Sequence, residues 1–280
     1  MTRKKKIALV IGAGSVKCAA ALGLWKVLQR ENIHFDMIVG SSGGSLYATS
    51  MALGFSLDEA VEKTKTLWNK AVTEKRNWRG LIGAILPGLF GFDERFSMVD
   101  DRLMLARLRA VFGEKTFEDA KTPLYLMATD FFTGESIALC KGKLVDAIRS
   151  SIAIPYIWSA WSLDGRLLID GSAANPLPVD VAIREGADII LAMGFESPYP
   201  SKIRSMSRYS LHINSLLTNN LYQANFAFHS AVHHAEIISI FPEFERLIRL
   251  FDTDQIPYVI EQGEKAMDEQ LAYLKRLLEA

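Results

Sequence analysis

Cysteine, net charge and long apolar runs are all scarce in this chain of 280 residues. The two cysteines, Cys18 and Cys140, lie in apolar contexts, which indicates reduced thiols rather than a disulfide scaffold. Lys and Arg total 32, and Asp and Glu also total 32, so the charge balance points to no nucleic-acid partner. No apolar run approaches the roughly 20 residues of a transmembrane helix.

The N-terminus also lacks the features of a secretory signal. Basic residues at 3–6 resemble the start of one, but only the apolar run Ile7–Ile11 separates them from Gly12. A signal sequence has a longer apolar region and a small-residue cleavage site. We therefore expect a cytoplasmic protein. Length and a hydrophobic content of 49% suit one large domain over residues 1–280, which the helix-rich part 200–280 completes.

Short apolar runs alternate with helical patterns along the chain. This alternation predicts an α/β fold, a three-layer sandwich with a mostly parallel central sheet. The expected strands are 7–11, 35–39, 124–129, 136–140, 167–169, 188–194 and 237–240. The expected helices are 18–30, 43–54, 57–75, 98–112, 143–151, 178–186, 209–235 and 257–278.

One glycine-rich stretch, Gly40-Ser41-Ser42-Gly43-Gly44, connects the expected strand 35–39 to a helix. A G-x-S-x-G sequence on a strand-to-helix turn places its middle serine at the tip of a sharp elbow. The backbone N–H groups of the following helix can stabilise an oxyanion there. Ser42 is therefore a candidate nucleophile, and an ordinary Ser/Gly turn that caps a helix is the structural alternative.

A second glycine loop, residues 12–17, follows the expected strand 7–11 and opens a helix. Free N–H groups at a helix start bind anions. A dinucleotide-binding loop would need a third glycine where this chain has Lys17, and an acidic residue after the second strand. Because the second strand instead runs into the serine elbow, we expect an oxyanion hole that faces Ser42. The candidate oxyanion residues are Gly12, Ala13, Gly14 and Ser15, and the supporting residues are Lys17, Gly40, Gly44 and Gly171.

A carboxylate follows the expected strand 167–169. Asp170 precedes Gly171-Ser172, at the edge where open α/β sheets keep their sites. Asp-Gly pairs are also common in turns, so a turn-capping role is the alternative. Asp170 is the candidate partner of Ser42.

Together these motifs make the chain resemble the small, single-domain, bacterial patatin-like phospholipases. The resemblance covers nearly the whole chain, and besides the two glycine motifs it rests on Ala128–Asp130, Thr133–Glu135, Ala147–Pro155, Asp170–Ser172 and Asn175-Pro176. It implies a Ser–Asp dyad: Ser42 attacks an acyl carbonyl, Asp170 accepts its proton and the loop 12–17 holds the oxyanion. It also implies a lipid or other acyl-ester substrate, with no cofactor and no metal. Phospholipid, lysophospholipid, glyceride and soluble ester all fit.

The chain departs from the family pattern in the same loop and after Asp170. Lys17 stands where the family more often has arginine, and Cys18 where it usually has glycine. Ala13 and Ser15 replace further glycines, and the aspartate motif is DGS rather than DGG or DGA. We expect the Cβ of Cys18 to tilt the loop. A catalytically degenerate, lipid-binding or regulatory protein is the corresponding alternative.

A Ser-His-Asp triad is the main rival to the dyad. His212, His229, His233 and His234 all follow Asp170, as the histidine of an α/β-hydrolase does. However, each of them falls in a helical pattern, and no HGGG-type loop precedes the elbow. Adjacent residues of a helix point apart, so the His233-His234 pair does not indicate a metal site.

The dyad chemistry requires a dry site, because a carboxyl with an ordinary pKa near 3.9 is a poor base for a serine hydroxyl. We expect Ile154–Trp158 and Trp161 to supply the walls. The apolar stretch 80–92 contains glycines and a proline that disfavour a rigid core helix. It is interpreted either as a loop packed over the sheet edge or as a mobile flap over Ser42, with residues 78–92 in peripheral contact with the inner membrane surface.

Overall fold

The computed structural model describes residues 4–196, 202–232 and 234–279. Within them, one eight-stranded sheet has the order β5-β6-β3-β2-β1-β7-β8, and β4 pairs with β3. β1, β2, β3, β7 and β8 are parallel neighbours, whereas β4 and β6 run antiparallel to β3, and β5 runs antiparallel to β6. The mostly parallel sheet that the sequence predicts is therefore confirmed. The strands are β1 (Ile7–Ile11), β2 (Met37–Ser41), β3 (Leu124–Asp130), β4 (Ser136–Leu139), β5 (Trp161–Leu163), β6 (Arg166–Asp170), β7 (Ile189–Met193) and β8 (Glu236–Ile240).

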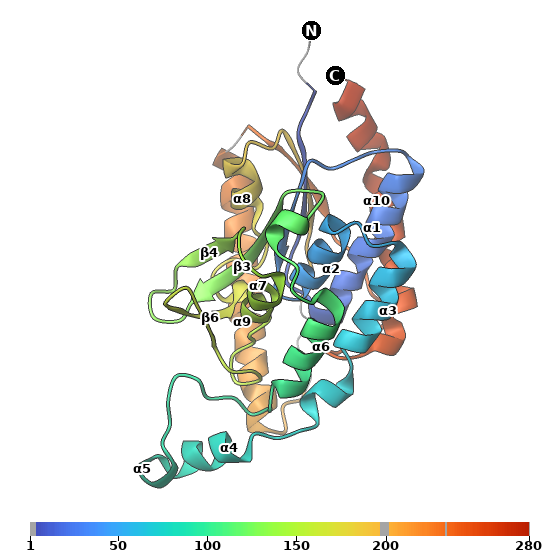
Figure 1. Ribbon diagram of the computed structural model, residues 1–280. Coiled ribbons are helices and arrows are strands. Elements are labelled where there is room, and N and C mark those ends of the chain that lie inside the picture. Colours follow the sequence, from blue (N-terminus) through green and yellow to red (C-terminus); the bar gives the residue numbers. More distant parts are fainter. Residues whose placement is uncertain (1–3, 197–201, 233, 280) are drawn as a thin grey trace.

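Helices cover both faces of the sheet (Figure 1). On one face lie α1 (Ala20–Arg30), α2 (Gly43–Ala52), α3 (Leu57–Leu67), α6 (Arg102–Phe112), α7 (Leu144–Ser151) and α10 (Ile256–Glu279). On the other lie α8 (Val179–Arg184) and α9 (Met206–Val232). The three-layer arrangement follows from the burial of both sheet faces, which parallel strands require.

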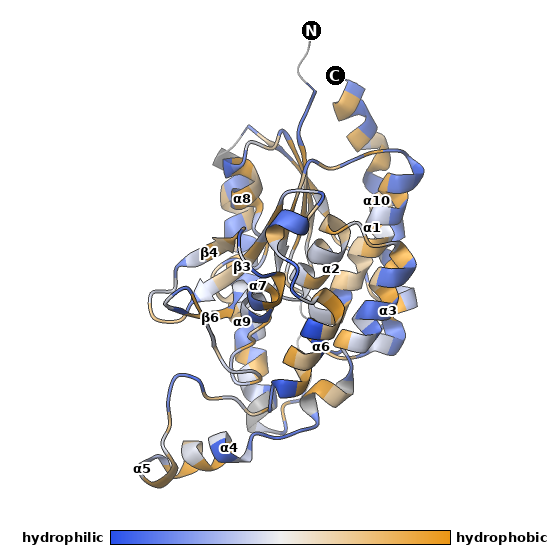
Figure 2. Ribbon diagram, viewed as in Figure 1, coloured by the Kyte–Doolittle hydropathy of each residue, from blue (hydrophilic) through white to orange (hydrophobic). Residues whose placement is uncertain are grey.

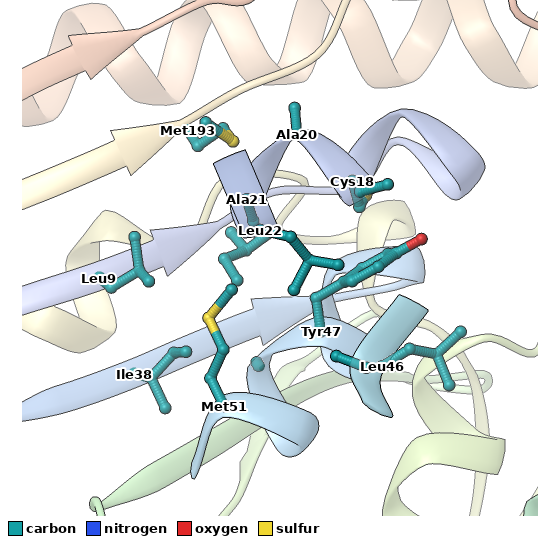
Figure 3. Close-up of a cluster of buried hydrophobic side chains, with 14 of the residues drawn as sticks. Leu9, Cys18, Ala20, Ala21, Leu22, Ile38, Leu46, Tyr47, Met51 and Met193 are labelled. Carbon is teal, nitrogen blue, oxygen red and sulfur yellow. The ribbon is translucent and has the colours of Figure 1, made fainter. Parts of the chain in front are cut away.

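The side chains of β1 alternate between two apolar cores. Leu9 and Ile11 pack into the core beneath α1 and α2, and Figure 3 shows Leu9, Leu22 and Met51 in the same buried cluster. Ala8 and Val10 belong to the opposite core with residues of α8. Since all of β1 is buried, its C-terminal end and the loop after it are held from both sides.

Several element boundaries differ from those expected. β2 extends to Ser41 instead of ending at residue 39. The helix expected over 57–75 ends at Leu67, because Trp68 leaves the helical conformation (φ −119°, ψ 72°). The helix expected over 98–112 begins only at Arg102, since the backbone N–H groups at 98 and 99 bond to the segment 156–157.

Strand β5 was not expected from the sequence. It forms a hairpin with β6, and the two-residue connection is Asp164-Gly165, both with positive φ (49° and 76°). Asp-Gly between two short strands is a strong hairpin signal, so the local sequence contains the information that predicts this turn.

The apolar stretch 80–92 neither packs as a loop over the sheet edge nor covers Ser42, so the structure contradicts these two placements. Most of it belongs to α4 (Trp78–Ile85) and α5 (Pro87–Phe90), which project from the body beyond α6 (Figure 1). α4 carries apolar residues, orange in Figure 2, on an exposed helix. Among the described residues no helix combines the length and hydropathy needed to cross a membrane.

Candidate active site

Ser42 lies at the sharp turn between β2 and α2. Its backbone has φ 53° and ψ −127°, in the positive-φ region that side chains rarely adopt. The turn packs closely on β1: a Cβ at Gly44 would come within 2.4 Å of the carbonyl oxygen of Ile11. The Ser42 N–H donates to Ser151 Oγ at 3.0 Å. These contacts hold a strained residue at the C-terminal edge of the sheet.

Asp170 faces this elbow from the end of β6. The Ser42 hydroxyl donates to Asp170 Oδ2 at 2.7 Å, and the Ser172 N–H donates to Asp170 Oδ1 at 2.9 Å. A third bond, from Thr129 Oγ1 to the Asp170 carbonyl oxygen (2.9 Å), fixes the backbone. Burial raises the pKa of Asp170 to about 6, although the hydrogen bonds from Ser172 and Ser42 oppose that increase.

The glycine loop after β1 lies on the other side of Ser42, but only part of it has N–H groups available. The Gly12 N–H donates to Met193 O, and the Ala13 N–H donates to Pro176 O at 2.8 Å. Among the described residues, the N–H groups of Gly14 and Ser15 have no protein acceptor, and both residues line the cavity that contains Ser42. Of the four residues expected to donate to an oxyanion, Gly14 and Ser15 therefore still have an N–H available, whereas Gly12 and Ala13 do not.

Lys17, the last residue of this loop, and Cys18, directly after it, are both buried. Lys17 Nζ donates to the carbonyl oxygen of Glu196 at 2.6 Å, and burial lowers its pKa to about 8. The Cys18 thiol donates to the Gly12 carbonyl oxygen at 3.3 Å, within the apolar cluster of Figure 3. Burial raises the pKa of the thiol. The cysteine thus anchors the start of the loop.

A cavity of about 490 Å³ opens over Ser42 and Asp170. Its walls come from the glycine loop, from the N-terminal half of α9 and from residues 247–250. Of the expected wall residues only Ile154 lines it, because Trp158 is in the buried core and Tyr156 is 52% exposed. A neighbouring cavity of about 690 Å³ shares Lys17, Leu247 and Ile248 as walls.

The residues that orient Ser42 and Asp170 were not among the expected site residues. Ser151, Thr129 and Ser172 supply hydroxyl or N–H groups to Ser42 and Asp170. Asn175 adds a further contact, since its carbonyl oxygen accepts from Ser41 Oγ at 2.9 Å. Thr129, Ser151, Ser172 and Asn175 all lie in stretches quoted above for the family resemblance, which was the available signal.

The candidate histidines of a triad do not all line the cavity. His212 does, whereas His229 and His234 are not among the residues that line it. His233 lies outside the described residues. Among residues 4–196, 202–232 and 234–279, no group of three or more His, Cys, Asp or Glu side chains lies in position to hold a metal ion.

The raised pKa of Asp170 implies that the free energy of unfolding depends on pH. Between pH 4 and 6 the folded protein binds more protons at this carboxyl than the unfolded chain does, so its free energy of unfolding falls as pH rises. Asp170→Asn removes this cost and retains an acceptor for the Ser172 N–H. Above pH 6 we expect the variant to be more stable than the wild type by about 3 kcal/mol, two pKa units at 1.36 kcal/mol each.

Urea unfolding at pH 4 and pH 8 measures this difference. The stability gain of Asp170→Asn should be present at pH 8 and small at pH 4. An equal difference at the two pH values would show that the Asp170 carboxyl does not titrate between them.

Comparison with known proteins identifies the family. Residues 9–183 match the patatin-like phospholipase family, and the chain therefore belongs to it. An uncharacterised NTE family protein of Mycobacterium tuberculosis is 30% identical over 188 residues, 67% of this chain and 48% of that protein. The neuropathy target esterase sws of Drosophila melanogaster is 28% identical over 190 residues, 67% of this chain and 13% of that protein. The matched part thus spans about half or less of these relatives.

A solved structure has the same fold. VipD from Legionella pneumophila aligns with a TM-score of 0.54 at 12% identity, over 97% of this chain and 67% of VipD. At this identity the likeness concerns the fold alone, and it agrees with the α/β architecture described above.

Proposed function

We propose that this protein is a serine acyl hydrolase that cleaves lipid esters with a Ser–Asp dyad. Ser42 Oγ attacks the carbonyl carbon while its proton passes to Asp170 Oδ2, and Asp170 gives this proton to the alkoxide, which leaves as the alcohol. Water then attacks the acyl–Ser42 ester and loses a proton to Asp170, which returns it to Ser42 Oγ as the carboxylic acid product leaves. The observation that carries the proposal is the 2.7 Å hydrogen bond from Ser42 Oγ to Asp170 Oδ2.

The environment of Asp170 suits a general base. The residue is 1% exposed, and burial raises the pKa of its carboxyl to about 6, closer to neutral pH than that of an ordinary aspartate. The N–H groups of Gly14 and Ser15, which have no acceptor in the part of the chain that the structure describes, supply donors for the tetrahedral oxyanion. Membership of the patatin-like phospholipase family agrees with this chemistry.

The direct serine–aspartate contact favours the dyad over a Ser-His-Asp triad. In a triad an imidazole lies between the two side chains, and here they bond to each other. The same contact favours a working site over a catalytically degenerate, lipid-binding protein, because nucleophile, base and donors all line one cavity.

The cavity and the family favour a lipid substrate. Incubating the purified protein with lysophospholipid, diacyl phospholipid and a p-nitrophenyl ester, and measuring release of fatty acid or nitrophenol, tests the proposal. Release from at least one lipid supports it. Failure on every ester would favour the lipid-binding alternative.

We further propose that α4 and α5 contact a membrane surface. Trp78, Ile85 and Leu89 are 69%, 78% and 79% exposed, and Arg76 and Arg79 lie beside Trp78 in the sequence. Exposed apolar side chains next to basic ones bind the interface of anionic bilayers. This segment lies apart from the cavity lining, so its contact is with the surface rather than with the bound ester.

Replacing Trp78, Ile85 and Leu89 with serine tests this contact. We expect at least tenfold weaker sedimentation with anionic phospholipid vesicles and slower lipid hydrolysis, while turnover of a soluble p-nitrophenyl ester stays within twofold. Phe132→Ser is the matched control, because Phe132 is also highly exposed (71%) but lies in the connection from β3 to β4. Unchanged vesicle binding, or equal loss on both substrates, would contradict the proposal.

A further inference from the structure

Trp68 makes hydrogen bonds that join the glycine loop to a wall of the cavity. It is the first residue beyond α3, and its side chain is almost fully buried. Its indole N–H donates to Ser15 Oγ at 2.9 Å and to the carbonyl oxygen of Leu250 at 2.7 Å. The Ser15 hydroxyl also donates to the Leu250 carbonyl. Three segments far apart in the sequence thus meet at one indole nitrogen.

Aromatic packing holds the indole in place. The ring of Trp68 lies 5.3 Å from that of Trp158, edge to face, and 5.3 Å from that of Phe251. Trp158 and Phe251 also contact each other at 5.9 Å. Contacts among three aromatic rings restrict the orientation of the Trp68 ring, so its N–H has a defined direction. Because α3 ends at Leu67, Trp68 leaves the helix and its side chain can bond to Ser15.

Ser15 needs such a restraint. Its φ is 54°, a conformation that a residue with a Cβ adopts only when its surroundings impose it. Its backbone lies directly against the elbow: a Cβ at Gly43 would be 2.8 Å from Ser15 N. The direction of the Ser15 N–H therefore depends on the contacts that hold the residue, and the side chain is bonded to Trp68 and Leu250.

We propose that Trp68 is a positioning residue, which holds Ser15 so that the N–H groups of Ser15 and Gly14 face the developing oxyanion. The inference rests on the acyl-hydrolase function proposed above. Because the oxyanion exists only in the transition state and the tetrahedral intermediate, a loosened loop lowers kcat and leaves KM nearly unchanged. A contribution to stability alone would leave kcat of the folded protein unchanged.

Trp68→Phe removes the N–H and keeps an aromatic ring. Trp158→Phe is the matched control, since it makes the same change in the same cluster and the Trp158 indole nitrogen has no hydrogen-bond partner among the described residues. On a soluble p-nitrophenyl ester, we expect Trp68→Phe to lower kcat at least tenfold with KM within twofold. Trp158→Phe should keep both constants within twofold, with a similar change in melting temperature.

Ser15→Ala supplies a second, smaller variant. It retains the backbone N–H but loses the hydroxyl that Trp68 and Leu250 hold, so we expect a similar loss of kcat. Combining Trp68→Phe with Ser15→Ala should cause little further loss, because both remove the same link. Equal kcat values for Trp68→Phe and Trp158→Phe, or fully multiplicative losses in the double variant, would overturn the inference. A wild-type protein without esterase activity would instead refute the proposed function.

Discussion

Ser42→Ala should abolish ester hydrolysis. Without the hydroxyl no acyl-enzyme forms, and we expect kcat/KM on a p-nitrophenyl ester to fall by about 10⁴-fold, which at 1.36 kcal/mol per factor of ten corresponds to about 5 kcal/mol of barrier. The Ser42 side chain makes its hydrogen bond to Asp170, and the backbone bond to Ser151 survives the change. The variant should therefore remain folded, as circular dichroism and a thermal melt would show.

Ser50→Ala is a suitable control for this variant. Ser50 is a buried serine of the neighbouring helix α2, and its hydroxyl donates to the carbonyl oxygen of Leu46 at 2.9 Å. It should keep activity within a few fold. Comparable turnover in Ser42→Ala and wild type would remove the whole assignment of the nucleophile.

Asp170→Asn should reduce activity nearly as much, by about 10³-fold or more, because an amide cannot accept the proton of Ser42. Wild-type kcat/KM should rise with pH through about 6, the pKa to which burial raises the Asp170 carboxyl. Steady-state assays from pH 4.5 to 8.5 measure both effects. Retention of the same pH profile in Asp170→Asn would show that another group is the base.

Histidine variants separate the dyad from the triad. His229→Ala and His234→Ala should leave kcat/KM within a few fold, and His212→Ala, in the cavity wall, should retain most of the activity. A loss of several orders of magnitude in any of these would replace the dyad by a triad.

The fold class was predictable because its signals are local. The buried run 7–11 is typical of a parallel strand. Glycine motifs follow this strand and the next one along the chain, and they predict that both loops lie at the same edge of the sheet. The mostly parallel sheet is confirmed. Ser42 and Asp170 are 128 positions apart and form a hydrogen bond. Because β6 runs antiparallel to β3, the two do not meet as the carboxyl ends of parallel strands. They meet because Asp170 pairs with Ala128 on β3, next to Met127, which pairs with Ser41 at the end of β2. The chemical roles of Ser42 and Asp170 stay predictions.

Other features depend on tertiary contacts that periodicity does not contain. The sequence around Ala13 does not indicate that the Ala13 N–H donates to the carbonyl oxygen of Pro176. Nothing in the helical pattern of 57–75 indicates that Trp68 leaves the helix to bond Ser15. The glycines of 80–92 have low helix propensity and so suggest a loop, but helix-start contacts offset that propensity here: the Asn77 side chain accepts from the Gly80 N–H, and Pro87 begins α5.

The C-terminal part contributes to the same architecture. β8 extends the sheet beside β7, and α10 packs so closely on α1 that a Cβ at Gly263 would lie 1.9 Å from the carbonyl oxygen of Ala20. Residues of α9 and of 247–250 line the cavity over Ser42. We propose on these grounds that the part after residue 200 completes one domain with the rest.

The most direct test of the central claim is to map the residue that a fluorophosphonate probe modifies. The probe reacts with activated serine nucleophiles, and mass spectrometry of a digest locates its adduct. We predict a single adduct on the peptide that contains Ser42, absent in Ser42→Ala and formed much more slowly in Asp170→Asn. An adduct on a different residue, or ester hydrolysis by a protein whose Ser42 stays unmodified, would contradict the account.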